Sequence, residues 1–184
     1  MKNFEFKNNI KIDLQNISIV DRGLKLVSIS DKYAKEIFCE FSEEVTRYMA
    51  PKPTENINET LDFISCSIEG MKAKQQLVLV ITSLKDEFLG CVALYCRGNA
   101  CSPELGVWVK KTAHGNGYGR KVVSSLFQWA SNTINFKYAI YPVDRRNIAS
   151  RKIPESLGGV IFKEAKVTTE SGNVLDEVVY QIKA

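Results

Sequence analysis

The stretch from Glu104 to Ala130 reads ELGVWVKKTAHGNGYGRKVVSSLFQWA, and it joins a strand pattern, a glycine-rich turn and a helix pattern. Glycines alternate within the turn, at Gly115, Gly117 and Gly119. The first amide N–H groups of a helix have no partner inside the helix, and the helix dipole adds partial positive charge at that end. Glycine lets the backbone approach a phosphate closely because it has no Cβ. The stretch therefore predicts an anion-binding turn at a helix N-terminus.

The glycine spacing narrows the class of phosphate ligand. A P-loop needs GxxxxGK followed by Ser or Thr, and a dinucleotide fingerprint needs GxGxxG within a βαβ unit, whereas this turn reads GxGxG. Basic residues on both sides add positive potential, namely Lys110, Lys111, Arg120 and Lys121. Taken alone, the turn is also compatible with an ordinary loop. The neighbouring sequence must therefore show whether the turn binds a phosphate.

Length and composition describe one folded domain. The chain has 184 residues, of which 45% are hydrophobic and 25% are charged, so it can bury a core. We therefore treat residues 1–184 as a single domain, with residues 1–20 as an extra strand-like segment. The net charge of +4 fits an anionic small ligand as easily as a nucleic acid.

The hydropathy pattern gives no sign of a leader or of a membrane segment. The first residues alternate between apolar and polar without the apolar run of a signal peptide. The longest continuous apolar run, Leu77 to Ile81, is far shorter than the roughly 20 residues that span a bilayer. We expect a soluble, cytoplasmic protein that does not bind a membrane.

The cysteine and histidine usage argues against a metal site. The five cysteines have no CxxC spacing, and five is an odd number. The single histidine, His114, is far in sequence from any zinc-like cluster. We expect no metal, and reduced thiols that are buried as small apolar groups.

The segments before the glycine turn predict helices followed by an antiparallel meander. Alternating residues indicate early strands at 10–14 and 23–29, and start signals and apolar spacing indicate helices at 30–41, 42–49 and 54–76. Thr54 is the expected N-cap of the last of these helices. Three buried strands follow in a row with short turns, at 76–83, 88–97 and 101–111.

The segments after the turn complete a mixed domain. They predict a helix to Ala130, a strand at 136–143, a helix at 147–159 disturbed by Pro154, and a hairpin of strands 160–169 and 174–182. The order predicts an α/β (α+β) fold with one mixed, mostly antiparallel sheet flanked by helices. The helix after the glycine turn crosses between two strands, which predicts one parallel pair.

The glycine turn and the segment VDRRNIASRKIPESLGG at 143–159 together resemble the GCN5-related N-acetyltransferase superfamily. His114, Gly117 and Gly119 fall on that superfamily's Gln/Arg-x-x-Gly-x-Gly pattern, with His in place of Gln or Arg. The resemblance covers roughly Gly23 to Ile182 and is closest to the ribosomal-protein alanine N-acetyltransferase type. Its other markers are GLKLVSIS, FLGCVAL, ELGVWV, an Asn-x-x-Ser pair and the closing strand LDEVVYQI.

The resemblance implies acetyl-CoA as co-substrate. The backbone of the turn is expected to hold its pyrophosphate, through His114, Gly115, Asn116, Gly117, Tyr118, Gly119 and Arg120. The backbone of Val107, Trp108 and Val109 is expected to pair with the pantetheine arm as an added strand would. Asn147 either hydrogen-bonds the pantetheine or the substrate-side backbone, or it caps the following helix.

The resemblance also implies two catalytic residues. Glu104 takes the position of the general base, although a solvent-facing strand carboxylate is the plain alternative. Many members carry a Tyr seven residues after the Asn as general acid, but that position is Pro154 here. The missing Tyr is common in the alanine-acetyltransferase type that the chain resembles, and that resemblance implies Ser150 as the candidate acid. An acceptor pocket walled by Tyr48, Met49, Lys52 and the turn at 170–173 is expected from the fold resemblance alone.

The resulting functional prediction is an enzyme that transfers acetyl from acetyl-CoA to a primary amine of a small molecule or of a protein N-terminus. The alternative is a catalytically inactive CoA-binding sensor or interaction module on the same fold, which the departures at His114 and Pro154 favour slightly. We expect no nucleic-acid partner because the basic residues are not interleaved with aromatic residues. The expected oligomeric state is a monomer or a homodimer.

Overall fold

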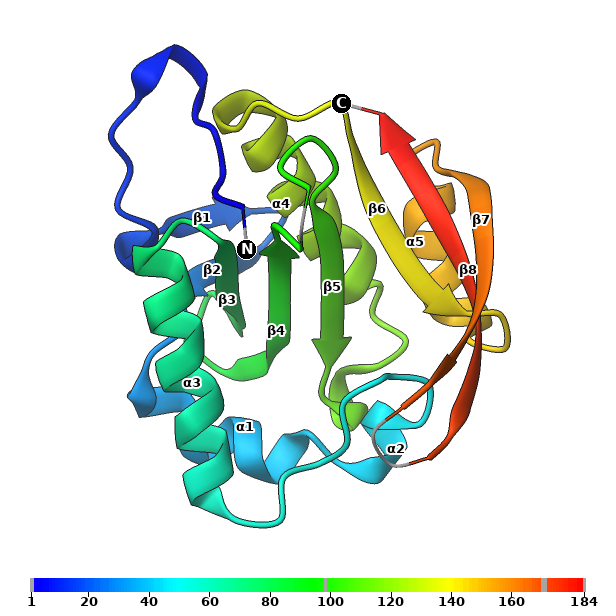
Figure 1. Cartoon of the computed structure of the whole chain (residues 1–184). Coiled ribbons are helices and arrows are strands. Elements are labelled where there is room, and N and C mark those ends of the chain that lie inside the picture. The colour runs from blue at the N-terminus through cyan, green and yellow to red at the C-terminus, as the bar shows by residue number, and fades with distance from the viewer. Residues whose placement is uncertain (1, 98, 170–171, 184) are drawn as a thin grey trace.

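The computed structural model describes residues 2–97, 99–169 and 172–183. Within them the strands form one sheet of eight, in the order β1-β2-β3-β4-β5-β6-β8-β7 (Figure 1). The strands are β1 Ser18–Asp21, β2 Leu24–Ser28, β3 Gln76–Ser83, β4 Phe88–Tyr95, β5 Glu104–Val109, β6 Tyr138–Asp144, β7 Val160–Thr168 and β8 Val174–Lys183.

Helices cover both faces of this sheet. They are α1 Ala34–Glu40, α2 Glu43–Thr46, α3 Ile57–Lys72, α4 Tyr118–Thr133 and α5 Ile148–Glu155. Helices α1 and α3 lie on one face, whereas α4 and α5 lie on the other (Figure 1). Helix α4 buries Val122, Val123, Leu126 and Ala130, at spacings of one, three and four, so one apolar stripe faces β4 and β5.

The predicted meander and parallel pair are confirmed. Strands β3, β4 and β5 are antiparallel neighbours, and β5 is parallel to β6. The parallel pair is short, because Glu104 opposite Ile140 is its single paired position. Beyond that point the two strands diverge toward their C-terminal ends (Figure 1). The β6-facing edge of β5 from Leu105 to Val109 therefore has no partner strand.

Two local predictions are wrong. The strand expected at 10–14 is absent: Asp13 accepts a hydrogen bond from the Gln15 amide and opens a short 3-10 turn at Leu14–Asn16. The edge strand β1 forms only after that turn. Helix α3 is capped by Asn56 rather than Thr54, because the Asn56 side chain accepts from the amides two and three residues ahead.

The cysteines match their prediction only in part. Cys91 and Cys96 are buried, whereas Cys39, Cys66 and Cys101 are exposed, and all five are free thiols. Among the described residues, no three side chains of the His, Cys, Asp or Glu type converge as metal ligands would. None of the described helices combines the length and the apolar character needed to cross a bilayer.

Candidate active site

A cavity of about 730 Å³ opens where β5 and β6 diverge. Strands β4, β5, β6 and β8, helix α5 and the glycine turn all contribute to its wall. Every predicted site residue except Asn116 lines it, namely Glu104, Val107, Trp108, Val109, His114, Gly115, Gly117, Tyr118, Gly119, Arg120, Asn147 and Ser150. The fold thus brings together residues that lie more than forty positions apart in the sequence.

The glycine turn ends in an uncapped helix N-terminus. Gly117 is the N-cap of α4 and has a φ of 69°, in the left-handed region that glycine adopts without strain. A Cβ added at Gly115 or Gly117 would meet nothing within 4 Å, so both residues face open space. Among the described residues, no side chain accepts a hydrogen bond from the first amides of α4. This end of the cavity fits an anion such as a pyrophosphate.

Side chains within the turn hold its backbone rather than point at a ligand. The Asn116 amide donates to the carbonyl oxygens of Ala113 and His114, at 3.1 and 3.2 Å. The His114 ring nitrogen Nε2 lies 2.7 Å from the carbonyl oxygen of Val109, the last residue of β5. His114 therefore ties the turn to the end of β5, which is a structural use for the residue that departs from the family pattern.

The basic residues near the turn are less available than the sequence suggested. Lys110 pairs with Glu87 at 2.8 Å, and Lys111 pairs with Glu44. These pairs reduce the positive potential that the two lysines add. Arg120 lines the cavity and forms no ion pair with any residue in the described ranges, so it keeps its charge for a ligand.

Glu104 begins β5 and faces the same cavity. Its side chain is 21% exposed, and its single ion pair with a described residue is a 3.4 Å contact between Oε1 and the Arg97 Nε. Burial raises the pKa of the Glu104 carboxyl, and the charge of Arg97 opposes that rise only in part. A carboxylate with a raised pKa is a better proton acceptor than one on an open strand face.

Ser150 lies beside a tyrosine that the sequence did not single out. The Tyr141 hydroxyl is 2.8 Å from the Ser150 Oγ, and burial raises the pKa of Tyr141 to about 12. Tyr141 alternates with Ala139 and Val143 on the buried face of β6, so its pattern is that of a core residue. Both residues line the cavity, and their hydroxyls form one hydrogen-bonded pair.

Helix α5 presents Ser150 from a regular first turn. The Asn147 side chain accepts a hydrogen bond from the Ser150 amide at 3.1 Å, so its capping role is confirmed, while it also lines the cavity. Pro154 does not break the helix, because it lies in the last turn and α5 continues to Glu155. It only removes the N–H that would bond the Ser150 carbonyl.

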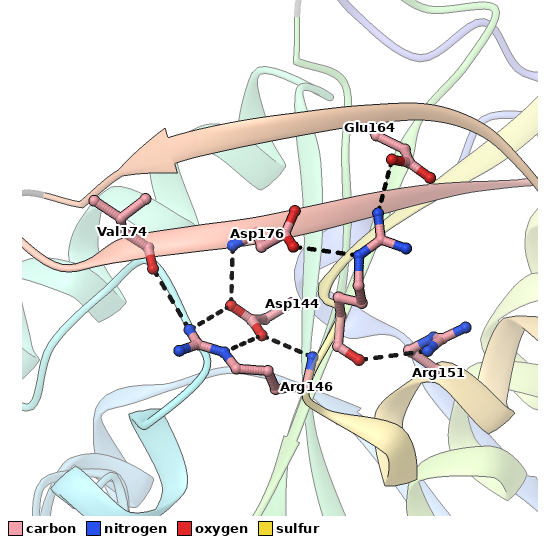
Figure 2. Close-up of polar contacts among 7 residues, drawn as sticks. Asp144, Arg146, Arg151, Glu164, Val174 and Asp176 are labelled. Carbon is pink, nitrogen blue, oxygen red and sulfur yellow. Dashed lines mark hydrogen bonds and ion pairs between the residues drawn. The ribbon is translucent and has the colours of Figure 1, made fainter.

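The end of β6 is held by a buried carboxylate, both of whose oxygens accept hydrogen bonds. The Asp144 side chain is fully buried and accepts two hydrogen bonds of 2.8 Å from the Arg146 guanidinium (Figure 2). It also accepts from the backbone amides of Arg146 and Asp176, at 2.9 and 3.1 Å. The hydrogen bonds from Arg146 hold the pKa of Asp144 below its ordinary value.

The same group of residues fastens β6 to the β7–β8 hairpin. Arg145 pairs with Asp176 on β8 and Glu164 on β7, at 3.2 and 2.7 Å (Figure 2). The Arg146 guanidinium also lies 5.6 Å from the centre of the Tyr48 ring. These contacts fix the end of β6 relative to the β7–β8 hairpin and to the loop after α2.

The predicted acceptor wall is present in part. Tyr48 and Met49 line the cavity, but Lys52 does not, and its ammonium pairs with Glu55. Of the turn at 170–173, positions 170 and 171 lie outside the described residues. The sequence reading missed Glu177 of β8, which lines the cavity as well. Its place in an alternating strand gave no signal, because such a residue is usually solvent-facing.

Comparison with known proteins identifies a family. A family model described as an acetyltransferase (GNAT) domain matches residues 24–160, which is most of the chain. A search of curated proteins finds no significant match.

Solved structures share the fold at low sequence identity. The Microcin C7 self-immunity acetyltransferase with acetyl-CoA and AMP has a TM-score of 0.78 and 20% identity, over 89% of this chain and 94% of that chain. An acetyltransferase from Salmonella typhimurium, described as modifying the N-terminal serine of a ribosomal protein, has a TM-score of 0.79 and 12% identity, over 90% and 98%. The ribosomal alpha-N-protein acetyltransferase RimL with coenzyme A has a TM-score of 0.76 and 14% identity, over 90% and 96%.

Proposed function

This chain belongs to the acetyltransferase (GNAT) family, and we propose that it transfers the acetyl group of acetyl-CoA to a primary amine by direct attack on the thioester. The family makes the chain an acyl-CoA-dependent acetyltransferase that uses acetyl-CoA as co-substrate. The proposed acceptor is the amine of a small molecule or of a protein N-terminus, and structural neighbours described as modifying ribosomal proteins support the second class.

One observation carries this proposal: a partly buried carboxylate and an uncapped helix N-terminus open into the same cavity from the two ends of β5. Glu104 begins the strand, and the glycine turn follows its last residue, Val109. The unpaired edge of β5 between them can hydrogen-bond an extended pantetheine arm. In this arrangement Arg120 and the first amides of α4 bind the pyrophosphate.

In the proposed reaction the amine nitrogen attacks the thioester carbonyl carbon, and the carbon–sulfur bond then breaks. The amine arrives mainly as an ammonium, because its pKa is about 8 for an α-amine and about 10.4 for a lysine-like amine. Glu104 takes a proton from it, directly or through water. Ser150, hydrogen-bonded to Tyr141, supplies a proton to the departing CoA thiolate. The second proton, which the nitrogen loses as the amide forms, replaces the one that Ser150 gives up.

A thermal-shift titration with acetyl-CoA tests the cofactor site. A ligand that binds the native state at 100 times its Kd stabilises it by about 2.7 kcal/mol. For a chain of this size the midpoint should rise by about 5–10 °C. Gly117→Glu should abolish the shift, because it places a side chain and a negative charge where the pyrophosphate lies.

Gly158→Glu is the matched control. Gly158 has a φ of 73°, close to the 69° of Gly117, and an added Cβ would also meet open space. It is not a lining residue of the cavity, so this variant carries similar backbone strain and charge but should keep the acetyl-CoA shift. A wild-type protein that shows no shift contradicts the proposal.

The alternative function is an inactive CoA-binding module on the same fold. Both functions predict the acetyl-CoA shift, so amine-dependent release of free CoA separates them. The raised pKa of Glu104 and the Ser150–Tyr141 pair support catalysis. Release of CoA that does not increase with any amine, in a protein that binds acetyl-CoA, would support the inactive module.

A further inference from the structure

The carboxylate of Glu177 has an unusual place in the cavity. It belongs to β8, lines the cavity and is partly buried. Within residues 2–97, 99–169 and 172–183 it forms no hydrogen bond and no ion pair. Burial, followed by the negative charges of Glu104 and Asp144, raises the pKa of Glu177, and the charge of Lys163 opposes the rise. The carboxylate is thus exposed to the cavity without a compensating partner.

Each of the two other carboxylates at this end of the cavity has an arginine partner. Glu104 pairs with Arg97, and Asp144 pairs with Arg146. Within the described residues, two lining cations have no ion pair: Arg120, in the first turn of α4 at the glycine turn, and Lys152, on α5. Among the lining carboxylates that the structure describes, Glu177 is therefore the one that has no ion pair.

The sheet register separates Glu177 from the proposed reaction centre. Glu104 lies opposite Ile140 of β6, whereas Glu177 lies opposite Asp144, four residues further along the same strand. At about 3.3 Å per residue, the two positions differ by about 13 Å along β6. The two carboxylates thus enter the cavity from positions that are offset along β6, although the charge of Glu104 still raises the pKa of Glu177.

We infer that Glu177 binds a second positive charge on the acceptor, so that the preferred acceptors are diamines or polyamines rather than monoamines. The inference rests on the proposed acetyl transfer. In this assignment the reacting amine lies at Glu104, and an ammonium several bonds away pairs with Glu177. The acceptor's charge complements the cavity's unpaired carboxylate, and Glu177 is a specificity residue rather than a catalytic one.

The test compares putrescine with butylamine, which share a four-carbon chain and differ by the second ammonium. Wild type should favour putrescine in kcat/KM by about tenfold, which corresponds to about 1.4 kcal/mol. Glu177→Gln should bring the ratio of the two values close to one, mainly through a higher KM for putrescine. A wild type that does not favour the diamine, or a variant that keeps the full preference, overturns the inference.

Glu164→Gln is the matched control. It removes the same charge from β7, where Glu164 is exposed, pairs with Arg145 and does not line the cavity. This variant should keep the wild-type preference. Calorimetric titration of the CoA-bound protein with each amine gives a second readout that needs no turnover, and putrescine should bind more weakly to Glu177→Gln than to wild type.

The two proposals fail in different ways. If acetyl-CoA shifts the melting temperature but putrescine is neither bound nor acetylated, the inference about Glu177 is wrong while the cofactor site stands. If acetyl-CoA gives no shift in wild type, the proposed function is wrong, and the inference falls with it.

Discussion

Glu104 and Asp144 lie on the two strands of the parallel pair, yet their surroundings are opposite. Asp144 is fully buried and accepts hydrogen bonds from one guanidinium and two backbone amides. Glu104 is partly buried and has one ion pair, at 3.4 Å. The pKa of Asp144 is lowered by the hydrogen bonds of Arg146, whereas the pKa of Glu104 is raised by burial.

The difference separates a structural carboxylate from one that is available for chemistry. A carboxylate whose oxygens are saturated stabilises the fold but has no capacity left for a substrate proton. A carboxylate that is buried without enough partners weakens the fold and is ready to accept a proton. Removal of the two should therefore affect different properties, stability for Asp144 and rate for Glu104.

The largest expected effect is the loss of catalytic rate in the Glu104→Gln variant. Loss of the base should lower kcat/KM by about 10²–10⁴. The melting temperature should stay level or rise, because the ionised form of a group with a raised pKa destabilises the folded state, and Gln removes that cost. The contribution of wild-type Glu104 to stability is therefore most favourable in acid and is lost as the pH rises through its raised pKa.

Steady-state kinetics and thermal melting on the same preparation check this prediction. Glu87→Gln is a suitable control, since Glu87 is an exposed carboxylate paired with Lys110. A parallel loss of rate and melting temperature in Glu104→Gln would show that Glu104 is structural, and the contrast with Asp144 would disappear.

Asp144→Ala should give the next largest effect, on stability. It leaves two backbone amides and a guanidinium without their acceptor, which should cost about 2–4 kcal/mol and lower the melting temperature by about 4–16 °C. Because the pKa of Asp144 is lowered, its contribution is fully present above the ordinary value of 3.8. It is lost as the pH falls below that value toward the lowered pKa.

Denaturant unfolding of wild type and Asp144→Ala at several pH values measures this effect. The difference in the free energy of unfolding should be constant near neutral pH and should narrow in acid. A difference below about 0.5 kcal/mol at neutral pH, the size of an ordinary surface substitution, would contradict a structural role.

Ser150→Ala should give the smallest effect of the three. A thiol has a pKa of about 8.5, so the CoA thiolate leaves readily and needs little acid help; we expect kcat to fall about tenfold, below the usual range for general acids. Tyr141→Phe should add little to this loss, because the two hydroxyls form one hydrogen-bonded pair. Single and double variants assayed together give the coupling, and fully additive losses would mean that the hydroxyls act separately.

The sequence predicts the parts of the site that depend on local pattern. The turn from Gly115 to Gly119 and the apolar spacing of Val122 and Leu126 define a strand, loop and helix, and the structure contains them in that order. Glu104 and Ser150 were found through family resemblance, and their roles remain proposals. The sequence does not determine the N-cap of α3, because Thr54 and Asn56 both suit an N-cap and only the backbone geometry selects one.

The remaining parts depend on contacts between distant segments. Tyr141 has the alternation of a core strand, and only the packing of α5 on β6 places its hydroxyl beside Ser150. Glu177 belongs to the last strand, and its access to the cavity follows from the sheet order β5-β6-β8. The periodicity of one strand does not show which residues of other elements lie beside Tyr141 or Glu177.

The most direct test of the central claim is the pH dependence of kcat/KM in wild type and Glu104→Gln. If Glu104 takes the amine's proton, the kcat/KM of the wild type should rise as the pH passes the raised pKa of Glu104, which lies above its ordinary 4.5. At higher pH it should level off. Glu104→Gln has no base, so its kcat/KM should keep rising until the amine itself loses its proton, at about pH 8–10. Two profiles that rise in parallel up to the pKa of the amine would contradict a catalytic role for Glu104.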